Sequence, residues 1–260
     1  MRLIALAIAV AVVLAVLYGF ATMLRRNSMF FPERYPVGAS WETRAEEVHF
    51  TSSDGVTLHG WLFSAGQPLI LWFHGNGGNI TERAPMAEEL ARRGLSVLLF
   101  DYRGYGKSDG TPTEDALYDD AEAAYAFAAT RSKDIALYGE SLGGPYAAWV
   151  AKHHRVRCVV IENSFPSLRE MGNAVYPPLG WFAPRAMNTA GWLNDAGVPV
   201  LVMHGRRDEV IPFALGQRLF EKLHGRKEML VSDTAGHCEI PSVEGARYYD
   251  TVVRFVKSPP

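Results

Sequence analysis

The feature that most constrains the fold of this chain is a series of short, mainly apolar runs, each followed by turn-forming residues. Apolar runs of this length fit strands buried on both faces, as in a parallel sheet covered by helices. Stretches with helical periodicity separate them, which implies right-handed crossovers and an α/β fold of three layers. Ligands of such folds collect outside the carboxyl ends of the strands. The runs are Leu69–Phe73, Ser96–Phe100, Ile135–Tyr138, Val156–Ile161, Val200–Met203 and Met229–Val231.

Turn and capping signals predict further elements. The turn residues 53–55 join two β-rich runs, Glu47–Phe50 and Val56–Phe63, which we expect to pair as an antiparallel hairpin. A helix is predicted over Asn79–Arg93, because a glycine follows it. Thr111–Glu114 has the spacing of a capping box with proline at the first helical position, so a second helix is predicted to begin there.

The amino-terminal tract has the properties of a membrane anchor. From Leu3 to Leu24 no residue is charged, and only Gly19 and Thr22 are not apolar. At about 1.5 Å per residue, such a helix can cross a hydrocarbon core of roughly 30 Å. The tract is too long for a secretory signal and lacks a good cleavage site, so a cleaved signal or a buried core helix is the weaker alternative. We predict a single-pass anchor over residues 1–26 and a stalk over residues 27–41. Arginines flank both sides, which leaves the orientation open.

Composition limits what the rest of the chain does. The whole chain has 26 Lys and Arg against 28 Asp and Glu, which gives a formal net charge of −2. The basic excess that drives non-specific nucleic-acid binding is therefore missing, and we expect no nucleic-acid partner. Cys158 and Cys238 match no metal or redox spacing, so we predict two ordinary buried thiols. One α/β domain is expected over residues 42–257, with residues 165–197 as a small helical cap.

The sequence Gly139-Glu140-Ser141-Leu142-Gly143 lies between a predicted strand and a predicted helix. This is the context of a nucleophile elbow, in which a strained turn exposes the serine and glycines avoid backbone clashes. The helix start also brings N–H groups to where an oxyanion would form. We expect Ser141 to be the nucleophile and the Leu142 N–H to be one oxyanion donor, with a structural glycine-rich turn as the alternative.

A glycine-rich loop, His74-Gly75-Asn76-Gly77-Gly78-Asn79, follows the first of the apolar runs. Such a loop lets the backbone approach a ligand closely, and we assign the Asn76 N–H as the second oxyanion donor. A phosphate cradle is the competing interpretation, but the loop lacks the Lys and Ser/Thr of a P-loop. We expect His74 to organise the loop and not to act as a base.

Asp208 and His237 follow the last two predicted strands. With Ser141 they occur in the chain order Ser, Asp, His, which is that of α/β hydrolases. We predict Asp208 as the acid that orients the base His237. The rival candidates are Glu209, Asp233 and Glu162 for the acid and His204 for the base.

Six separated motifs in one order resemble the membrane-anchored α/β-hydrolase-domain proteins of the bud-emergence type, which include abhydrolase-domain depalmitoylases and related serine hydrolases. They are HGNGGN at 74–79, FDYRGYGKSDGTPTE at 100–114, YGESLGG at 138–144, IENSFPSLREMG at 161–172, HGRRDEVIP at 204–212 and GH at 236–237.

This resemblance, over residues 28–255, implies an eight-stranded sheet with its second strand antiparallel, and the catalytic triad Ser141, Asp208 and His237. It also implies a structural, non-catalytic loop from Asp101 onward. Where the family often has Asn or Asp after the histidine, this chain has Cys238 and Glu239, and Glu239 is a candidate to tune the histidine.

These observations together predict a membrane-anchored serine hydrolase of carboxylic ester or thioester bonds, acting through an acyl-enzyme on Ser141. We expect a small-molecule or lipid acyl substrate, and neither a cofactor nor a metal. A peptidase or amidase of the same fold is the first alternative, and a catalytically silent, membrane-tethered interaction protein is the second. The physiological substrate and the oligomeric state stay open.

Overall fold

The protein is described here from a computed structural model, which covers residues 29–35, 43–175, 177 and 187–260. The chain divides into two units, Met1–Phe31 and Pro32–Pro260, and the second is described below. The predicted anchor over residues 1–26 lies outside the described residues. Within those residues, no helix is both long enough and apolar enough to cross a membrane.

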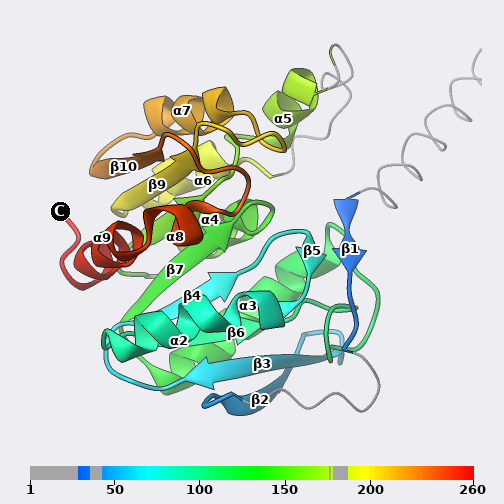
Figure 1. The fold of residues 1–260 in the computed structure, drawn as a ribbon. Helices are drawn as coiled ribbons and strands as arrows, with labels where there is room; N and C mark the ends of the chain where they lie inside the picture. The colour runs from blue at the N-terminus through cyan, green and yellow to red at the C-terminus, as the bar shows by residue number, and fades with distance from the viewer. Residues whose placement is uncertain (1–28, 36–42, 176, 178–186) are drawn as a thin grey trace, which may run out of the picture. The chain divides into compact units, whose positions relative to one another are not determined.

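In the described part of the chain, eight strands form one mixed sheet in the order β10-β9-β8-β7-β4-β6-β3-β2 (Figure 1). Strand β3 runs antiparallel to both of its neighbours, and the remaining pairs are parallel. The predicted α/β fold, with eight strands of which the second is antiparallel, is confirmed. The bounds are β2 Glu46–Thr51, β3 Thr57–Phe63, β4 Leu69–Phe73, β6 Ser96–Phe100, β7 Ile135–Glu140, β8 Val159–Glu162, β9 Val200–Gly205 and β10 Lys227–Ser232.

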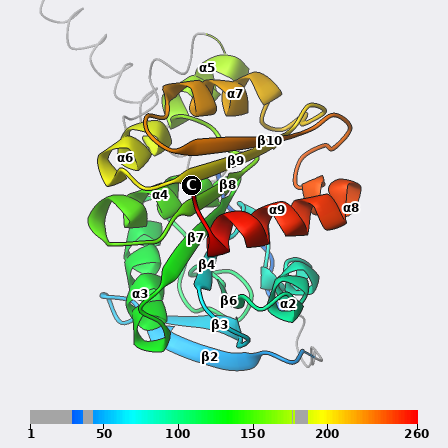
Figure 2. The ribbon, with the colours of Figure 1, turned by 90° about the vertical axis from the view of Figure 1, so that its left-hand side faces the viewer.

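Helices cover both faces of this sheet (Figure 2). Helices α2 and α9 pack together on one face, and α3, α4 and α6 pack in sequence on the other, while α7 contacts β9 and α6. The short elements β1 and β5 lie outside the main sheet. The bounds are β1 Phe31–Pro32, β5 Gly77–Gly78, η1 Ile80–Glu82, α2 Ala84–Arg92, α3 Ala116–Arg131, α4 Gly143–His153, α5 Leu168–Val175, α6 Thr189–Ala196, α7 Phe213–Lys222, α8 Ile240–Glu244 and α9 Ala246–Lys257.

Two predicted helix starts are wrong in detail. The segment predicted as one helix over Asn79–Arg93 is a 3₁₀ turn, η1, followed by α2, and Asn79 caps the 3₁₀ turn through the N–H of Thr81. Helix α3 begins at Ala116 and not at Thr111. Its N-cap residue is Asp115, whose side chain makes no capping hydrogen bond, while the Thr113 hydroxyl accepts a hydrogen bond from the Ala116 N–H at 3.3 Å.

Parts of two predicted regions fall on described residues. Of the predicted stalk, Glu33 donates its N–H to Gly78 and Tyr35 donates its N–H to Gly106, so this part is hydrogen-bonded to the α/β domain. Of the predicted cap, α5 and α6 are described, and α6 packs on α4. Residues 176 and 178–186 of the cap lie outside the described part, and the cap stays a prediction.

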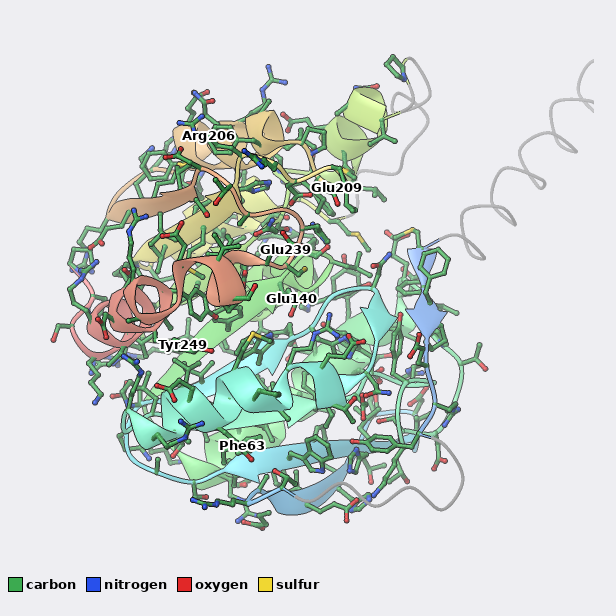
Figure 3. The ribbon with its side chains drawn as sticks, viewed as in Figure 1. Phe63, Glu140, Arg206, Glu209, Glu239 and Tyr249 are labelled. Atoms are coloured by element: carbon green, nitrogen blue, oxygen red, sulfur yellow. The ribbon has the colours of Figure 1, made fainter. Side chains whose placement is uncertain are left out.

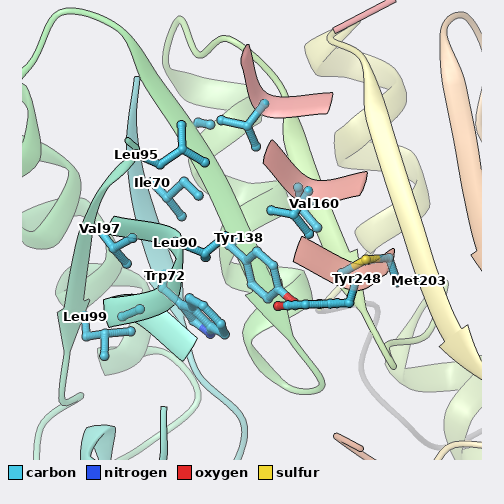
Figure 4. Packing of buried hydrophobic residues seen from close by; sticks show 14 of the residues in the cluster. Ile70, Trp72, Leu90, Leu95, Val97, Leu99, Tyr138, Val160, Met203 and Tyr248 are labelled. Carbon is cyan, nitrogen blue, oxygen red and sulfur yellow. The ribbon is translucent and has the colours of Figure 1, made fainter. Parts of the chain in front are cut away.

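The central strands are fixed by large apolar side chains (Figure 4). The rings of Trp72 on β4 and Tyr138 on β7 stack with their centroids 4.0 Å apart, and both are almost fully buried. Leu90 of α2 and Tyr248 of α9 belong to the same buried cluster. Burial of such side chains stabilises by about 1.5–3 kcal/mol each. The pairing of β4 with β7 therefore lies within the buried core of the sheet.

One acid is buried at the end of β8. Glu162 is 2% exposed, and its carboxyl accepts a hydrogen bond from Tyr138, whose hydroxyl also lies 2.8 Å from that of Tyr248. Burial raises the pKa of Glu162 to about 8, and the charge of Glu140 adds to the rise. The Glu162 side chain is therefore neutral at pH 7 in the folded protein.

This raised pKa predicts a pH-dependent effect of Glu162→Gln. The unfolded chain releases the Glu162 proton near pH 4.3 and the folded chain near pH 8, so the native side chain costs progressively more stability as the pH rises between these values. We expect the Gln variant to gain free energy of unfolding over wild type at pH 8.5, and to gain little at pH 4.5, in urea titrations. An equal difference at both pH values would contradict an ionisation effect.

Candidate active site

Ser141 lies in the sharp turn between β7 and α4. Its φ angle is +52°, a left-handed conformation that is costly for a serine. The turn is tight because the elbow runs directly beneath the end of β4. A Cβ atom at Gly143 would lie 2.0 Å from the carbonyl oxygen of Phe73, so only glycine fits at this position. The local geometry is that of a nucleophile elbow.

The structure brings Ser141, His237 and Asp208 together from three separate strand ends. The Ser141 Oγ atom lies 3.1 Å from His237 Nε2, and His237 Nδ1 lies 2.9 Å from Asp208 Oδ2. In one tautomer of the neutral ring, Nδ1–H donates to the carboxylate while Nε2 accepts from the serine hydroxyl. The His237 side chain is 17% exposed, and the Asp208 side chain is fully buried.

The Asp208 carboxylate is held by several donors. Its Oδ1 atom accepts from the N–H groups of Val210 and Ile211 at 3.0 and 2.8 Å. Its Oδ2 atom accepts from Asn163 Nδ2. Burial alone would raise the pKa of Asp208, but the hydrogen bond from His237 and the other donors outweigh it and hold the pKa below its ordinary value. The acid is thus ionised and oriented toward His237.

Asn163 is a site residue that the sequence reasoning missed. It directly follows β8, has a φ angle of +46°, and its side chain reaches both Asp208 and the carbonyl of Gly236 at 3.4 Å. A polar residue at the carboxyl end of a parallel strand was a visible signal. What the residue contacts could not be derived, because Asp208 lies 45 positions away in the chain.

The rival acids and the rival base lie elsewhere around the site. His204 is buried, with Nε2 2.8 Å from the carbonyl of Ile211 and 3.4 Å from Asp208 Oδ2. Glu162 is bonded to Tyr138, and the exposed Asp233 pairs with Arg206. Glu209 and Glu239 are both labelled in Figure 3, and a Cβ atom at Gly236, in the loop that carries His237, would lie 3.2 Å from Glu209 Oε2 and 2.9 Å from Glu239 Oε2.

The loop that contains Asn76 lies beside the elbow, and its carbonyl groups are held in place. Tyr102 and Tyr105 donate their hydroxyls to the carbonyls of His74 and Asn76 at 3.2 and 2.8 Å. His74 Nδ1 lies 2.7 Å from the carbonyl of Gly75. Because a trans peptide is planar, this contact turns the N–H of Asn76 in the opposite direction from that carbonyl. Burial, and then the charge of Arg83, lowers the pKa of His74 to about 4, so its ring is neutral.

Leu142 occupies the N-cap position of α4. The first N–H groups of a helix have no acceptor within the helix, and the helix dipole adds partial positive charge there. The elbow and the Asn76 loop are adjacent, since a Cβ atom at Gly75 would lie 3.5 Å from Ser141 Cβ. Both predicted donor segments therefore border the serine.

The loop after β6 has structural contacts. Asp101 accepts the N–H of Ile80 at 3.0 Å, and Arg103 forms an ion pair with the buried Asp120 at 2.7 Å. These bonds tie the loop to η1 and α3. The described contacts of Asp101 and Arg103 do not include Ser141 or His237.

The residues after His237 correct one prediction. Cys158 is buried, but Cys238 is only partly buried, because it lies in the loop after β10, and its thiol points to Glu140 at 3.4 Å. Glu239 accepts the N–H of Gly236 at 2.8 Å. Through this bond Glu239 shapes the backbone just before the histidine.

Comparison with known proteins agrees with this architecture. A family model described as the alpha/beta hydrolase fold matches residues 68–185. The Mycobacterium tuberculosis protein MT2364 is 34% identical, over 95% of this chain and 93% of its own length. Protein bem46 of Schizosaccharomyces pombe is 30% identical, over 72% of this chain and 71% of its own length.

A solved structure has the same fold. The Pyrococcus furiosus esterase Pf2001 matches with a TM-score of 0.72 at 24% sequence identity, covering 88% of this chain and 97% of the esterase. The assignment of the chain to a family rests on the family model and on its sequence identity to MT2364 and bem46 over most of its length. This protein belongs to the α/β-hydrolase family.

Proposed function

We propose that this protein is a membrane-anchored serine hydrolase that cleaves carboxylic ester or thioester bonds through an acyl-enzyme on Ser141. The observation that carries the proposal is the hydrogen-bonded chain from Ser141 Oγ through His237 to Asp208, with distances of 3.1 and 2.9 Å. A nucleophile, a base and an orienting acid in this arrangement form the constellation that activates serine for acyl transfer.

In the acylation step, Ser141 Oγ attacks the acyl carbonyl as its proton passes to His237 Nε2. Asp208 holds the Nδ1–H tautomer and stabilises the imidazolium that forms. The proton on Nε2 then passes to the departing alcohol or thiol, and the acyl group stays on the serine. The lowered pKa of Asp208 supports this role, because the acid is an anion throughout the neutral pH range.

The negative charge of the tetrahedral intermediate would be stabilised by the N–H groups of Asn76 and Leu142. Losing one such donor costs about 10²–10³-fold in kcat in other hydrolases. Deacylation uses the same groups. Water attacks the acyl-enzyme as His237 takes its proton, and that proton returns to Ser141 Oγ as the acid product leaves.

The class of bond is inferred from two considerations. The structural neighbour Pf2001 is named an esterase, which favours ester over amide substrates for this chain. The apolar tract from Leu3 to Leu24 would keep the enzyme at a membrane, where lipid esters, acylated proteins and lipophilic small esters reside. We therefore propose acyl substrates with an apolar chain.

Labelling with a fluorophosphonate probe tests the nucleophile. We expect wild type to be labelled on Ser141 and Ser141→Ala to remain unlabelled and to lose ester turnover. Ser96→Ala, which changes a buried serine at the start of β6 that bonds to Ala65 and Gly66, is the control and should still be labelled. Equal labelling of wild type and Ser141→Ala, or of neither, would exclude the assignment. Turnover of an amide but not of the matched ester would instead favour the peptidase alternative.

Replacing Asp208 by Asn tests the acid. The side chain keeps its shape but loses the charge that holds the histidine tautomer, so kcat should fall by about 10⁴-fold with little change in KM. Asp233→Asn, an exposed acid paired with Arg206, serves as the matched control and should stay within about twofold of wild type. If kcat falls only slightly in Asp208→Asn, another acid orients His237.

Removing residues 1–26 tests the anchor. Without the apolar tract the remaining chain loses the segment that could enter a bilayer, so it should leave the membrane fraction on centrifugation and retain its ester turnover. Full-length protein treated in parallel should sediment with membranes. If the truncated chain still sediments with membranes, the attachment lies elsewhere.

A further inference from the structure

This inference rests on the proposed function. We propose that the buried ion pair between Arg83 and Glu140 is a positioning element that holds together three segments of the active site. These segments are the elbow (residues 139–143), the oxyanion loop (residues 75–79) and the histidine loop (residues 235–239). Neither residue of the pair lies within the triad or among the two oxyanion donors.

Arg83 links the elbow to the oxyanion loop. Its guanidinium makes a two-pronged contact with Glu140, from Nε to Oε2 at 3.1 Å and from Nη2 to Oε1 at 2.6 Å. The remaining nitrogen, Nη1, donates to the carboxylate of Glu82 at 2.6 Å and to the carbonyl of Asn79 at 3.3 Å, and it reaches that of Gly77 at 3.5 Å. The Arg83 guanidinium therefore binds both Glu140, the residue before the nucleophile, and the carbonyls of Gly77 and Asn79 in the oxyanion loop.

Glu140 is the residue in contact with all three segments. It belongs to the elbow and immediately precedes Ser141. A Cβ atom at Gly75 would lie 3.1 Å from its Oε1 atom, so the oxyanion loop packs directly on the carboxylate. The Cys238 thiol, next to His237, donates to the same oxygen at 3.4 Å. Cys238 stands where the family often has Asn or Asp after the histidine, and its contact with Glu140 connects the histidine loop to the elbow.

Both partners of the pair are buried and charged. Burial alone would raise the pKa of Glu140, but the charge and hydrogen bonds of Arg83 outweigh it and lower the pKa to about 2. Arg83 and Glu140 are 8% and 3% exposed as whole residues. A buried ion pair is a poor source of stability compared with apolar packing, whereas its directional bonds define geometry. We therefore assign the pair to positioning.

A cavity of about 130 Å³ lies against the pair, on the side lined by Met86, Cys238 and Pro241. Packing alone thus does not enclose the pair on every side. Without the guanidinium, the oxyanion loop could shift toward this space, and the Asn76 N–H would move relative to Leu142. A misplacement of about 1 Å in a catalytic group can cost about 10²-fold in rate.

The test compares Arg83→Met with Arg93→Met in the full-length enzyme. Arg93 follows the other end of α2, where it pairs with Glu89 and Asp250 at the surface, so it is a matched control. We expect kcat for an ester substrate to fall about 10²-fold in Arg83→Met with KM within about threefold, because the lost geometry matters only in the transition state. Arg93→Met should stay within about twofold.

Two further measurements separate positioning from a general loss of stability. Leu90→Ala removes a buried side chain of the same helix and should lower the free energy of unfolding while kcat per folded molecule is unchanged. In a double-mutant cycle, the kcat of the double variant Arg83→Met, Glu140→Gln should be no lower than that of the slower single variant, since both substitutions break the same contact. If Arg83→Met does not fold, Arg83→Lys replaces it in the cycle.

The outcomes separate the two proposals. If wild type turns over no ester and labels no serine, the proposed function fails. The positioning role is overturned, while the proposed function stands, if wild type is active but Arg83→Met keeps its kcat. It is also overturned if the fold-losses in kcat of Arg83→Met and Glu140→Gln multiply in the double variant. A fall in kcat for Leu90→Ala as large as that for Arg83→Met would also overturn it.

Discussion

The parallel pairing of β4 with β7 is the constraint on which the site depends. Phe73 is opposite Gly139 in this pair, so the two strands end side by side, and the oxyanion loop and the elbow leave the sheet together. The stacked rings of Trp72 and Tyr138 hold the two strands in this register from within the core. A shift of one residue would exchange the faces of every side chain on a strand and separate the two donor segments.

A second layer of polar contacts then sets the positions of the loops. The left-handed Ser141, the hydrogen-bonded carbonyls of residues 74–79 and the donors around Asp208 all orient groups within a part of the molecule that is closely packed. Strain at the elbow persists only because the surrounding structure determines it. Buried polar groups such as Arg83, Glu140 and Asn163 orient these loops through directional hydrogen bonds.

Much of the fold could be predicted because the signals are local. The apolar runs mark the strands, and the glycines around Ser141 mark a tight turn, which the close approach of Gly143 to Phe73 explains. Helix starts were less predictable. Thr111 and Thr113 both offer a side-chain oxygen, but α3 begins at Ala116 with Asp115 at its N-cap, and only the Thr113 oxygen is seen to accept the Ala116 N–H. Asn79 caps only the short 3₁₀ turn η1, because η1 ends at its C-cap residue Arg83. Arg83 is also the N-cap residue of α2.

The sequence by itself determined the order of the elements and the residue types at the strand ends, because burial patterns and turn chemistry act over a few neighbouring residues. It also ranked Asp208 above Glu162 and Asp233. Only the tertiary structure decided which side chains meet. Asn163 reaches Asp208 across 45 positions, and Arg83 reaches Glu140 across 57. Such contacts depend on strand order, register and loop paths, which arise only when the whole sheet is assembled.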